Sequence, residues 1–292
     1  MFTGCGTAIV TPFTQDRSLD EATLRNLVRR QIHAGINFLV PCGTTGESPT
    51  LERAEHLRVV EITLEEAKGI VPVLAGAGGY NTGEVIDLAR ELQTMGADGI
   101  LSVTPYYNKP TQEGMYQHFK AIAENTSLPL MLYNIPGRTG VNMNTDTLLR
   151  LAEIKNYFSV KEASGNLDQI REVINRVPKN FMVYSGDDGL TLDVLKMGGF
   201  GVVSVASHLV GKQIKQMICL AKAGKIAEAE VLNQKLQDVF KVLFIISNPS
   251  PLKAAMNLIG FKAGGVRLPL VMPNATELAQ IKKALDALAL TV

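Results

Sequence analysis

The sequence carries no excess of charge of one sign. Its 29 lysine and arginine residues nearly balance 28 aspartate and glutamate residues, which gives a formal net charge of +1. Acidic and basic residues are interspersed, so no basic patch indicates binding to nucleic acid or to an anionic membrane. We therefore expect no nucleic-acid partner.

Long apolar runs and paired cysteines are also missing. No window approaches the ~18 consecutive apolar residues that span a bilayer, and the opening MFTGCGTAIV lacks the basic and apolar regions of a secretory signal. The three cysteines, Cys5, Cys42 and Cys219, lie far apart and match no CxxC spacing, which favours a reducing compartment. These absences together predict a soluble, cytoplasmic protein with no membrane partner.

The four histidines form no HxH or HExxH pattern. Zinc sites usually draw their ligands from such closely spaced pairs. The paired acids Asp187 and Asp188 could ligate a cation, but no further ligands cluster near them in the sequence. We expect no metal.

The sequence does contain enough apolar residues for a large core, because 46% of its 292 residues are hydrophobic and 20% are charged. Short runs rich in β-branched residues alternate with amphipathic segments. Each run is almost continuously apolar, which is typical of parallel strands covered on both faces. The predicted strands are residues 6–13, 37–43, 71–78, 99–107, 129–136, 157–164, 181–188 and 201–208.

The segments between these runs have the marks of helices. LDEATLRNLVRRQIHAG and TGEVIDLARELQTMGA start near a capping residue, Asp20 or Thr82, and both end at glycine. Eight strand–helix units predict a (β/α)8 TIM barrel over residues 1–224. A doubly wound open sheet is the alternative, because a count of units does not establish closure. Residues 225–292 read as three further helices, a C-terminal helical extension packed on the barrel.

Catalytic groups in a parallel barrel collect where strands end and the following loops begin. Five predicted strand ends carry hydroxyl, glycine or ionisable residues in place of plain turn residues. They are GTTGES at 43–48, TPYYN at 104–108, YNIPGRTG at 133–140, the segment ending in Lys161, and SGDDG at 185–189. Their number indicates a site at this end of the barrel.

Lys161 follows an apolar run before any turn residue occurs. Burial lowers the pKa of a lysine and makes the neutral amine a nucleophile, which suits Schiff-base chemistry with a carbonyl substrate. The alternative is a lysine whose head group reaches water from the strand end. Lys253, in the helical extension, is better suited to packing or charge pairing.

The other strand ends allow similar pairs of interpretations. The GTTGES loop offers N–H groups and hydroxyls for a small carboxylate, or it is a tight turn that caps the next helix. Neither this loop nor GAGGYN matches a nucleotide-binding motif. Tyr106, Tyr107 and Tyr133 could relay protons or pack in the core, and Arg138 could hold a carboxylate or be a solvated loop residue.

Taken together, the strand-end motifs resemble those of a known family. GTTGES, TPYYNKP, YNIPGRTG, SVKEASGN, YSGDDG and GGVRLPL are similar to the motifs of the dihydrodipicolinate synthase (4-hydroxy-tetrahydrodipicolinate synthase) family, in the N-acetylneuraminate lyase superfamily. The resemblance extends over essentially the whole chain. It implies a lyase in which Lys161 forms an imine with pyruvate, and it implies no metal or organic cofactor.

The resemblance also implies a role for each matching residue. Thr45 and the backbone of its loop would hold the pyruvate carboxylate, and the enamine would attack L-aspartate 4-semialdehyde to give 4-hydroxy-tetrahydrodipicolinate, on the route to diaminopimelate and lysine. Arg138 would bind the semialdehyde carboxylate. The proton relay would comprise Tyr133, Thr44 and Tyr107, with Tyr107 reaching a neighbouring subunit's site, and the main chain of Gly186 and Val203 would line the pyruvate pocket. The implied assembly is a homotetramer built as a dimer of tight dimers, with dimers as a variation.

One set of positions departs from the family pattern. Members inhibited by lysine carry histidine, asparagine, glutamate and tyrosine in a cleft between subunits. His56, Glu84 and Tyr106 match this pattern, but Tyr80 stands where the asparagine is expected, with Asn81 beside it. The resemblance therefore leaves feedback by lysine open.

Two other functions stay open at this level. The first is another pyruvate aldolase of the superfamily, an N-acetylneuraminate lyase or a keto-deoxy sugar acid aldolase. Arg138 argues against it, because such relatives generally lack this arginine. The second is a non-catalytic barrel that binds a keto acid.

Overall fold

The structure, a computed structural model, describes residues 2–290, and the chain divides into two compact units. The first comprises Met1–Pro72 and Ser204–Val292, and the second comprises Val73–Val203. The first unit contains β1 (Gly4–Ala8), α1 (Glu21–His33), β2 (Phe38–Val40), the short 3-10 helix η1 (Ser48–Thr50), α2 (Arg53–Ala67), α9 (Ser207–Lys222), α10 (Ile226–Val242), α11 (Ser250–Leu258) and α12 (Ala275–Asp286).

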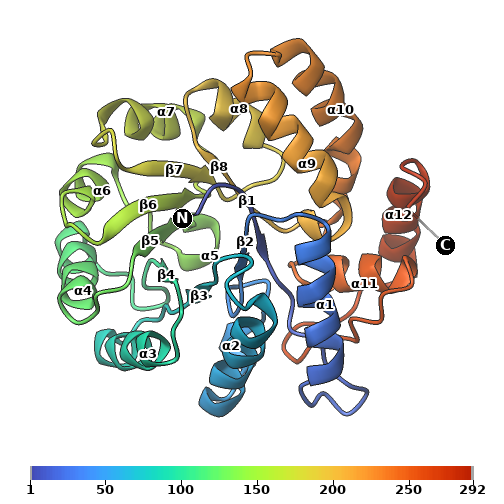
Figure 1. Cartoon of the computed structure of the whole chain (residues 1–292), viewed down its shortest axis with the longest axis horizontal. Helices are drawn as coiled ribbons and strands as arrows, with labels where there is room; N and C mark the ends of the chain where they lie inside the picture. The colour runs from blue at the N-terminus through green and yellow to red at the C-terminus, as the bar shows by residue number, and fades with distance from the viewer. Residues whose placement is uncertain (1, 291–292) are drawn as a thin grey trace. The chain divides into compact units, whose positions relative to one another are not determined.

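The second unit alternates strands with helices (Figure 1). Its elements are β3 (Leu74–Gly76), α3 (Thr82–Thr94), β4 (Gly99–Val103), α4 (Gln112–Glu124), β5 (Leu130–Asn134), α5 (Pro136–Thr139), α6 (Thr145–Ala152), β6 (Tyr157–Glu162), α7 (Leu167–Arg176), β7 (Met182–Ser185), α8 (Thr191–Lys196) and β8 (Gly201–Ser204), whose last residue belongs to the first unit. All eight predicted strands are present, and each is followed by a helix.

Strand order within each unit distinguishes the predicted barrel from the doubly wound alternative. In the second unit, each strand from β3 to β8 pairs in parallel with the next one along the chain, and in the first unit β1 pairs in parallel with β2. A doubly wound sheet reverses its strand order at a switch point. The second unit contains no such reversal among its described strands, as expected for consecutive units of a barrel.

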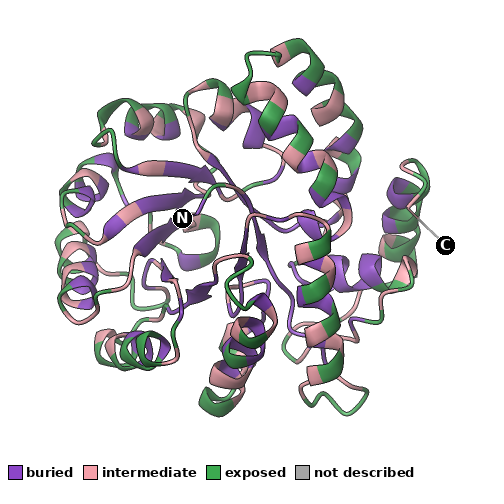
Figure 2. Ribbon diagram, viewed as in Figure 1, coloured by how far each residue is buried: buried purple, intermediate pink, exposed green. Residues whose placement is uncertain are grey.

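The strands are covered on both faces, as their apolar composition predicts. Figure 2 shows them largely in the colour of buried residues, and Phe38, Leu39 and Val40 of β2 are fully inaccessible. Because both faces are buried, a charged residue on a strand has few routes to water. This property defines the environment of Lys161.

The predicted capping residue is the observed one for α1 but not for α3. The Asp20 side chain caps α1 by accepting a hydrogen bond from the Thr23 N–H. For α3 the cap is Asn81 and not Thr82, because the Asn81 amide oxygen accepts hydrogen bonds from the Gly83 and Glu84 N–H groups. Thr82 is the first helical residue, and its hydroxyl instead contacts a buried histidine, His118.

The helices α10, α11 and α12 confirm the three predicted after residue 224. The division of the chain at that residue stays a prediction. Within residues 2–290, no helix combines the length and apolar character needed to cross a membrane.

Candidate active site

Lys161 lies on β6, directly paired with Tyr133 of the neighbouring strand β5. Residues paired across a ladder point to the same face of a sheet, and the Lys161 Nζ lies 4.2 Å from the centre of the Tyr133 ring. Both side chains are buried, with 4% and 5% exposure. The amine therefore lies inside the protein and does not reach water as a solvated strand-end lysine would.

Burial lowers the pKa of Lys161 to about 8 from the ordinary 10.5. The loss of hydration of the ammonium ion is the largest cause, and the positive charge of Arg138 acts in the same direction. The carboxylate of Asp188 opposes both by favouring the charged form. The result is an amine that is partly neutral, and hence nucleophilic, near neutral pH.

Gly186 leaves space for the lysine side chain. A Cβ atom at this position would lie 3.0 Å from Lys161 Cε and 2.8 Å from Ala163 Cβ, which is closer than packed carbon atoms approach. The Gly186 N–H donates to the Glu162 carbonyl, which keeps the turn after β7 close to β6. Val203, the other predicted pocket residue, is fully buried on β8.

Arg138 lies on the short helix α5 after β5 and is exposed. Its loop is held by Asn134, whose Oδ1 accepts from the Met143 N–H at 3.0 Å. The Asn134 Nδ2 donates to Asn142 Oδ1 and to both oxygens of Glu162. The loop that carries the cation is thus fastened to two strands.

Glu162, next to Lys161, is a buried acid that sequence reasoning missed. It is 1% exposed, and burial raises the pKa of its carboxyl above the ordinary value, although hydrogen bonds from Ser164 and Asn134 oppose the shift. The alternation of side chains along a strand could have revealed it. Lys161 and Glu162 are adjacent, so their side chains point to opposite faces of the strand. Because both faces are buried, one of these two charges must find partners on the side that the helices cover.

The predicted carboxylate loop, GTTGES, follows β2 in the first unit. Thr45 is 3% exposed and Thr44 is half-buried. The Thr11 hydroxyl donates to the Gly46 carbonyl at 2.6 Å. A Cβ atom at Gly46 would lie 3.0 Å from the Cys42 nitrogen, so the backbone around this turn leaves little room for a larger residue.

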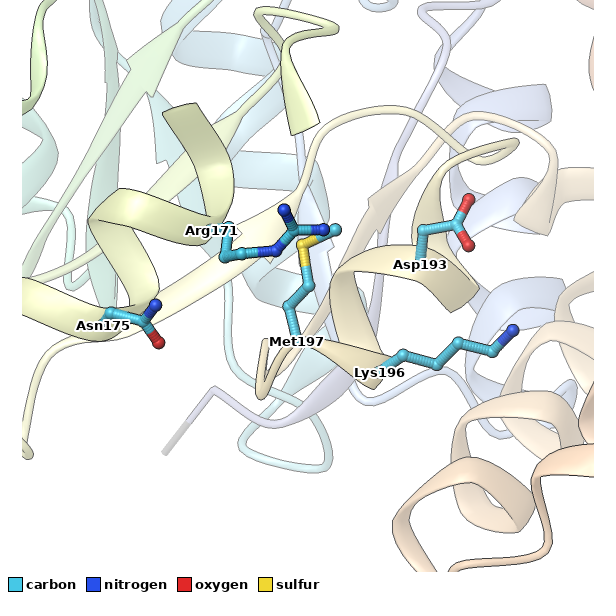
Figure 3. A pocket seen from close by; sticks show the side chains of 5 residues that line it. All are labelled: Arg171, Asn175, Asp193, Lys196 and Met197. Atoms are coloured by element: carbon cyan, nitrogen blue, oxygen red, sulfur yellow. The ribbon is translucent and has the colours of Figure 1, made fainter. Parts of the chain in front are cut away.

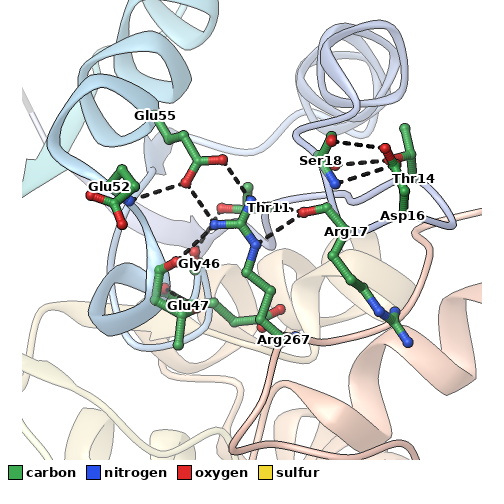
Figure 4. Close-up of polar contacts among 11 residues, drawn as sticks. Thr11, Thr14, Asp16, Arg17, Ser18, Gly46, Glu47, Glu52, Glu55 and Arg267 are labelled. Atoms are coloured by element: carbon green, nitrogen blue, oxygen red, sulfur yellow. Dashed lines mark hydrogen bonds and ion pairs between the residues drawn. The ribbon is translucent and has the colours of Figure 1, made fainter.

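This loop is also held by residues that are remote in the sequence. Glu47, in the left-handed backbone conformation at φ 57°, forms an ion pair with Lys253 of α11 at 2.7 Å, and both side chains are almost fully buried. The Glu47 Oε2 also accepts from the Arg267 N–H. Figure 4 shows Arg267 beside Glu47 and Glu55, and its guanidinium donates to both Glu55 oxygens at 2.6 Å.

The ion pair confirms that Lys253 serves charge pairing. Burial lowers the pKa of Lys253 to about 8, against the opposing influence of Glu47. Lys253 therefore resembles Lys161 in its pKa. Its amine, however, forms an ion pair with Glu47 and donates a hydrogen bond to the Gly265 carbonyl. Sequence reasoning did not identify Glu47 or Arg267, because only the folded chain brings them to Lys253.

The remaining predicted tyrosines lie outside the core. Tyr107 is 87% exposed and has a left-handed backbone at φ 70°. Tyr80 is half-exposed and packs edge-to-face on Tyr106 with 5.3 Å between ring centres. Glu84 accepts from the Asn81 amide, and these residues all belong to the second unit.

His56 belongs to the first unit, where it is buried on α2. The predicted lysine site thus draws on both units, as does the predicted catalytic set. In the second unit the structure brings together Lys161, Tyr133 and Gly186, with Arg138 and Asp188 in electrostatic contact with the amine.

Among residues 2–290, no three His, Cys, Asp or Glu side chains gather closely enough to hold a metal ion. The Asp187 carboxylate accepts from the Gly189 N–H at 2.8 Å and so closes a turn.

A separate surface pocket of about 430 Å³ lies between α7 and α8 (Figure 3). None of the predicted site residues lines it; its lining residues are Arg171, Asn175, Asp193, Lys196 and Met197.

A series of parallel βα units that buries a nucleophilic lysine beside a tyrosine defines a barrel enzyme equipped for imine chemistry. The model of the dihydrodipicolinate synthetase family matches residues 1–288. The chain belongs to this family.

Curated relatives are similar over nearly their whole length. The chain is 51% identical over 280 residues to 4-hydroxy-tetrahydrodipicolinate synthase 1 of Halalkalibacterium halodurans, which covers 96% of this chain and 95% of the relative. It is 49% identical over 282 residues to 4-hydroxy-tetrahydrodipicolinate synthase of Bacillus velezensis, with 97% and 98% coverage. The chain therefore aligns with nearly the whole length of these two relatives.

Solved structures confirm the fold class. Dihydrodipicolinate synthase from Acinetobacter baumannii, in complex with pyruvate, matches with a TM-score of 0.97 at 40% identity and covers 99% of this chain and 100% of that chain. The enzyme from Cyanidioschyzon merolae with lysine bound gives 0.97 at 41% identity, with 99% of each chain covered. A monomeric dihydrodipicolinate synthase variant gives 0.97 at 42% identity, with 99% and 97% coverage. The fold is a (β/α)8 barrel with C-terminal helices, and the open-sheet alternative is wrong.

Proposed function

We propose that this chain condenses pyruvate with L-aspartate 4-semialdehyde to form 4-hydroxy-tetrahydrodipicolinate, the first committed step toward diaminopimelate and lysine. Family membership and the similarity to enzymes of that name support the reaction. The observation that carries it to this chain is the buried Lys161 amine, whose pKa of about 8 leaves a nucleophile close to neutral pH. The enzyme is a lyase of the Schiff-base type.

The reaction begins when the neutral Lys161 amine attacks the carbonyl carbon of pyruvate. Loss of water gives an iminium ion, whose positive nitrogen accepts electrons when a proton leaves the methyl group. The resulting enamine carbon attacks the aldehyde, forming the new C–C bond. The amino group of the semialdehyde then displaces Lys161 and closes the ring, which restores the enzyme.

The remaining residues bind the substrates and move protons. Thr45 and the N–H groups of its loop hold the pyruvate carboxylate, and the main chain at Gly186 and Val203 forms the pocket wall. Arg138, an exposed cation on α5, binds the semialdehyde carboxylate. Protons pass through Tyr133, Thr44 and a Tyr107 supplied by a neighbouring subunit. Burial of Lys161 and Tyr133 supports this scheme, because a site closed to bulk water needs an internal relay.

The assembly we propose is a cytoplasmic homotetramer built from tight dimers. Tyr107 is consistent with it, because its aromatic side chain is 87% exposed and therefore accessible to a second chain.

We further propose that a regulatory site for lysine lies at the subunit interface and comprises His56, Tyr80, Glu84 and Tyr106. Calorimetry with L-lysine tests this site, and the absence of heat at millimolar lysine would reject it.

Borohydride reduction with pyruvate, followed by intact mass and peptide mapping, tests the proposed chemistry. We expect one reduced pyruvate adduct per chain, located on Lys161 and absent from Lys161→Ala. An adduct on Lys253, or no adduct, would overturn the proposal. A protein that only binds a keto acid would show no mass increase. Turnover with aspartate semialdehyde but not with sialic acid would separate the synthase from the related aldolases.

A further inference from the structure

The hydroxyl of Thr45 has a specific partner far away in the sequence. Asn248, just before α11, donates a hydrogen bond from its Nδ2 to Thr45 Oγ1 at 2.9 Å. The two residues are 203 positions apart, both belong to the first unit, and both are buried, with 4% and 3% exposure. A buried hydrogen bond between two side chains over this separation fixes the direction in which the threonine hydroxyl can act.

A hydroxyl group has one proton to donate and two lone pairs to accept. Because the Asn248 amide occupies a lone pair of Thr45 Oγ1, the hydroxyl proton remains available for another acceptor. A carboxylate is only an acceptor, so a threonine whose lone pair is already used is set as a donor toward it. Hydrogen bonds to a charged acceptor are also the stronger kind.

The backbone that carries Asn248 is itself anchored to the same loop. Lys253, on the first turns of α11, forms the buried ion pair with Glu47, two residues after Thr45. The Lys253 N–H donates to the Pro249 carbonyl, which ties the ion pair to the residue after Asn248. The start of α11 thus contacts the GTTGES loop at two points, one ionic and one through a neutral amide.

We propose that Asn248 is a positioning residue for the keto acid: by donating to Thr45, it orients the threonine hydroxyl as a donor to the substrate carboxylate. The inference rests on the proposed function, in which Thr45 binds that carboxylate. It assigns to the C-terminal helical segment a part in substrate affinity, in addition to its packing.

The test compares four variants with the wild type: Asn248→Ala, Asn248→Asp, Thr45→Val, and the double variant Asn248→Ala/Thr45→Val. Imine formation is measured by borohydride trapping as a function of pyruvate concentration. We expect Asn248→Ala to raise the half-saturating pyruvate concentration about tenfold, the effect of losing one hydrogen bond to a charged group, with little change in the KM for the semialdehyde.

Asn248→Asp is nearly isosteric and should be worse than Asn248→Ala. A carboxylate at this position would accept the Thr45 proton and would also repel the substrate anion. In the double variant, the Asn248 substitution should add nothing to Thr45→Val, because the hydroxyl it orients is absent. Trapping with pyruvamide, which lacks the carboxylate, should not distinguish Asn248→Ala from the wild type.

Other outcomes would overturn the role of Asn248 and leave the proposed reaction unaffected. If the wild type forms the imine but both Asn248 variants keep its pyruvate dependence, Asn248 does not orient Thr45. Effects that add in the double variant, or that extend to pyruvamide and the semialdehyde, would show a packing role only. Thermal unfolding of each variant verifies folding, and Asn248→Asp keeps the size of the side chain should the alanine variant fail to fold. Failure of the wild type to form any adduct would instead refute the proposed function.

Discussion

At the residue scale, the electrostatic surroundings of one amine determine how the site operates. Lys161 is buried among groups of opposite influence, with Arg138 lowering its pKa and Asp188 raising it. The two side chains provide a pair of substitutions with opposite expected effects. Such a pair is more informative than either alone, because general damage to the site would not move the two variants in opposite directions.

Imine formation should therefore rise with pH, with a midpoint at about 8, since only the neutral amine attacks pyruvate. Asp188→Asn removes the carboxylate that favours the ammonium ion, so its midpoint should move to lower pH. Arg138→Met removes a repelling cation, so its midpoint should move to higher pH. Borohydride trapping rates from about pH 6 to about pH 10 measure all three. Midpoints that move in the same direction would contradict this account of the pKa.

Arg138 should also separate the two substrates. Arg138→Ala is expected to lower kcat/KM for the semialdehyde about a hundredfold, because a charged hydrogen-bonding partner of the carboxylate is lost. Pyruvate trapping, measured at about pH 9 where most Lys161 is neutral, should change far less. Arg171→Ala, an exposed arginine on α7, serves as the control. Equal damage to both substrates would refute the assigned role.

The sequence could predict single residues only where local context was informative. Lys161 stood out because an apolar strand immediately precedes it, and Lys253 could be set apart because it follows the last strand. Glu162 and Glu47 were missed because each is an ordinary acid next to a more conspicuous residue, and their partners Asn134 and Lys253 meet them only after folding. Chemistry that depends on long-range contacts leaves little trace in a local pattern.

At the element scale, a buried ion pair links the loop after β2 to the helix α11. Removing one member of a buried pair leaves an uncompensated charge, which is far more costly than losing an exposed pair. The Glu47–Lys253 pair therefore offers a direct measure of how strongly the helical extension stabilises the barrel loop.

Lys253→Met should lower the free energy of unfolding by about 3–5 kcal/mol, because Glu47 would remain buried without its cation. Lys282→Met removes the exposed Lys282–Asp286 pair of α12 and should cost no more than about 1 kcal/mol. Adding Glu47→Gln to Lys253→Met should recover part of the loss. Urea denaturation measures each value, and a Lys253→Met protein as stable as the Lys282→Met control would contradict the prediction.

Element positions were largely predictable, and their boundaries less so. Continuous apolar runs identified all eight strands because a strand buried on both faces needs such a composition. The predicted strands were too long: residues 37–43 were expected where β2 covers only Phe38–Val40. The excess residues at the end of that run lead into the GTTGES turn, and one of them, Cys42, adopts a left-handed backbone. Apolar character continues into the turn although strand geometry does not.

At the scale of the whole molecule, the count of βα units predicted the barrel, but nothing in the pattern of one chain encodes how copies assemble. Tyr107 is the residue through which the proposed assembly would affect catalysis. On the described chain it is an exposed phenol, 87% accessible, that follows β4. If its hydroxyl completes the proton relay of a neighbouring subunit, each active site in a tight dimer combines residues from two chains.

Mixing two impaired proteins tests this sharing directly. Lys161→Ala lacks the nucleophile, and Tyr107→Phe lacks only the relay hydroxyl. In a mixed dimer, one site combines Lys161 from the Tyr107→Phe chain with Tyr107 from the Lys161→Ala chain, and the other site lacks both. Random co-refolding makes half of the tight dimers mixed, with one intact site in two, so about a quarter of wild-type activity should return.

The matched control replaces Lys161→Ala with the double variant Lys161→Ala/Tyr107→Phe, which can supply neither group. If Tyr107 instead serves the site of its own chain, every site in the first mixture lacks either the amine or the phenol, and activity stays at the level of the Tyr107→Phe protein. Sedimentation of the mixture ensures that both samples contain assembled subunits. Recovery in the first mixture and not in the control requires that the phenol act across the interface, since no other arrangement of the two chains restores a complete site.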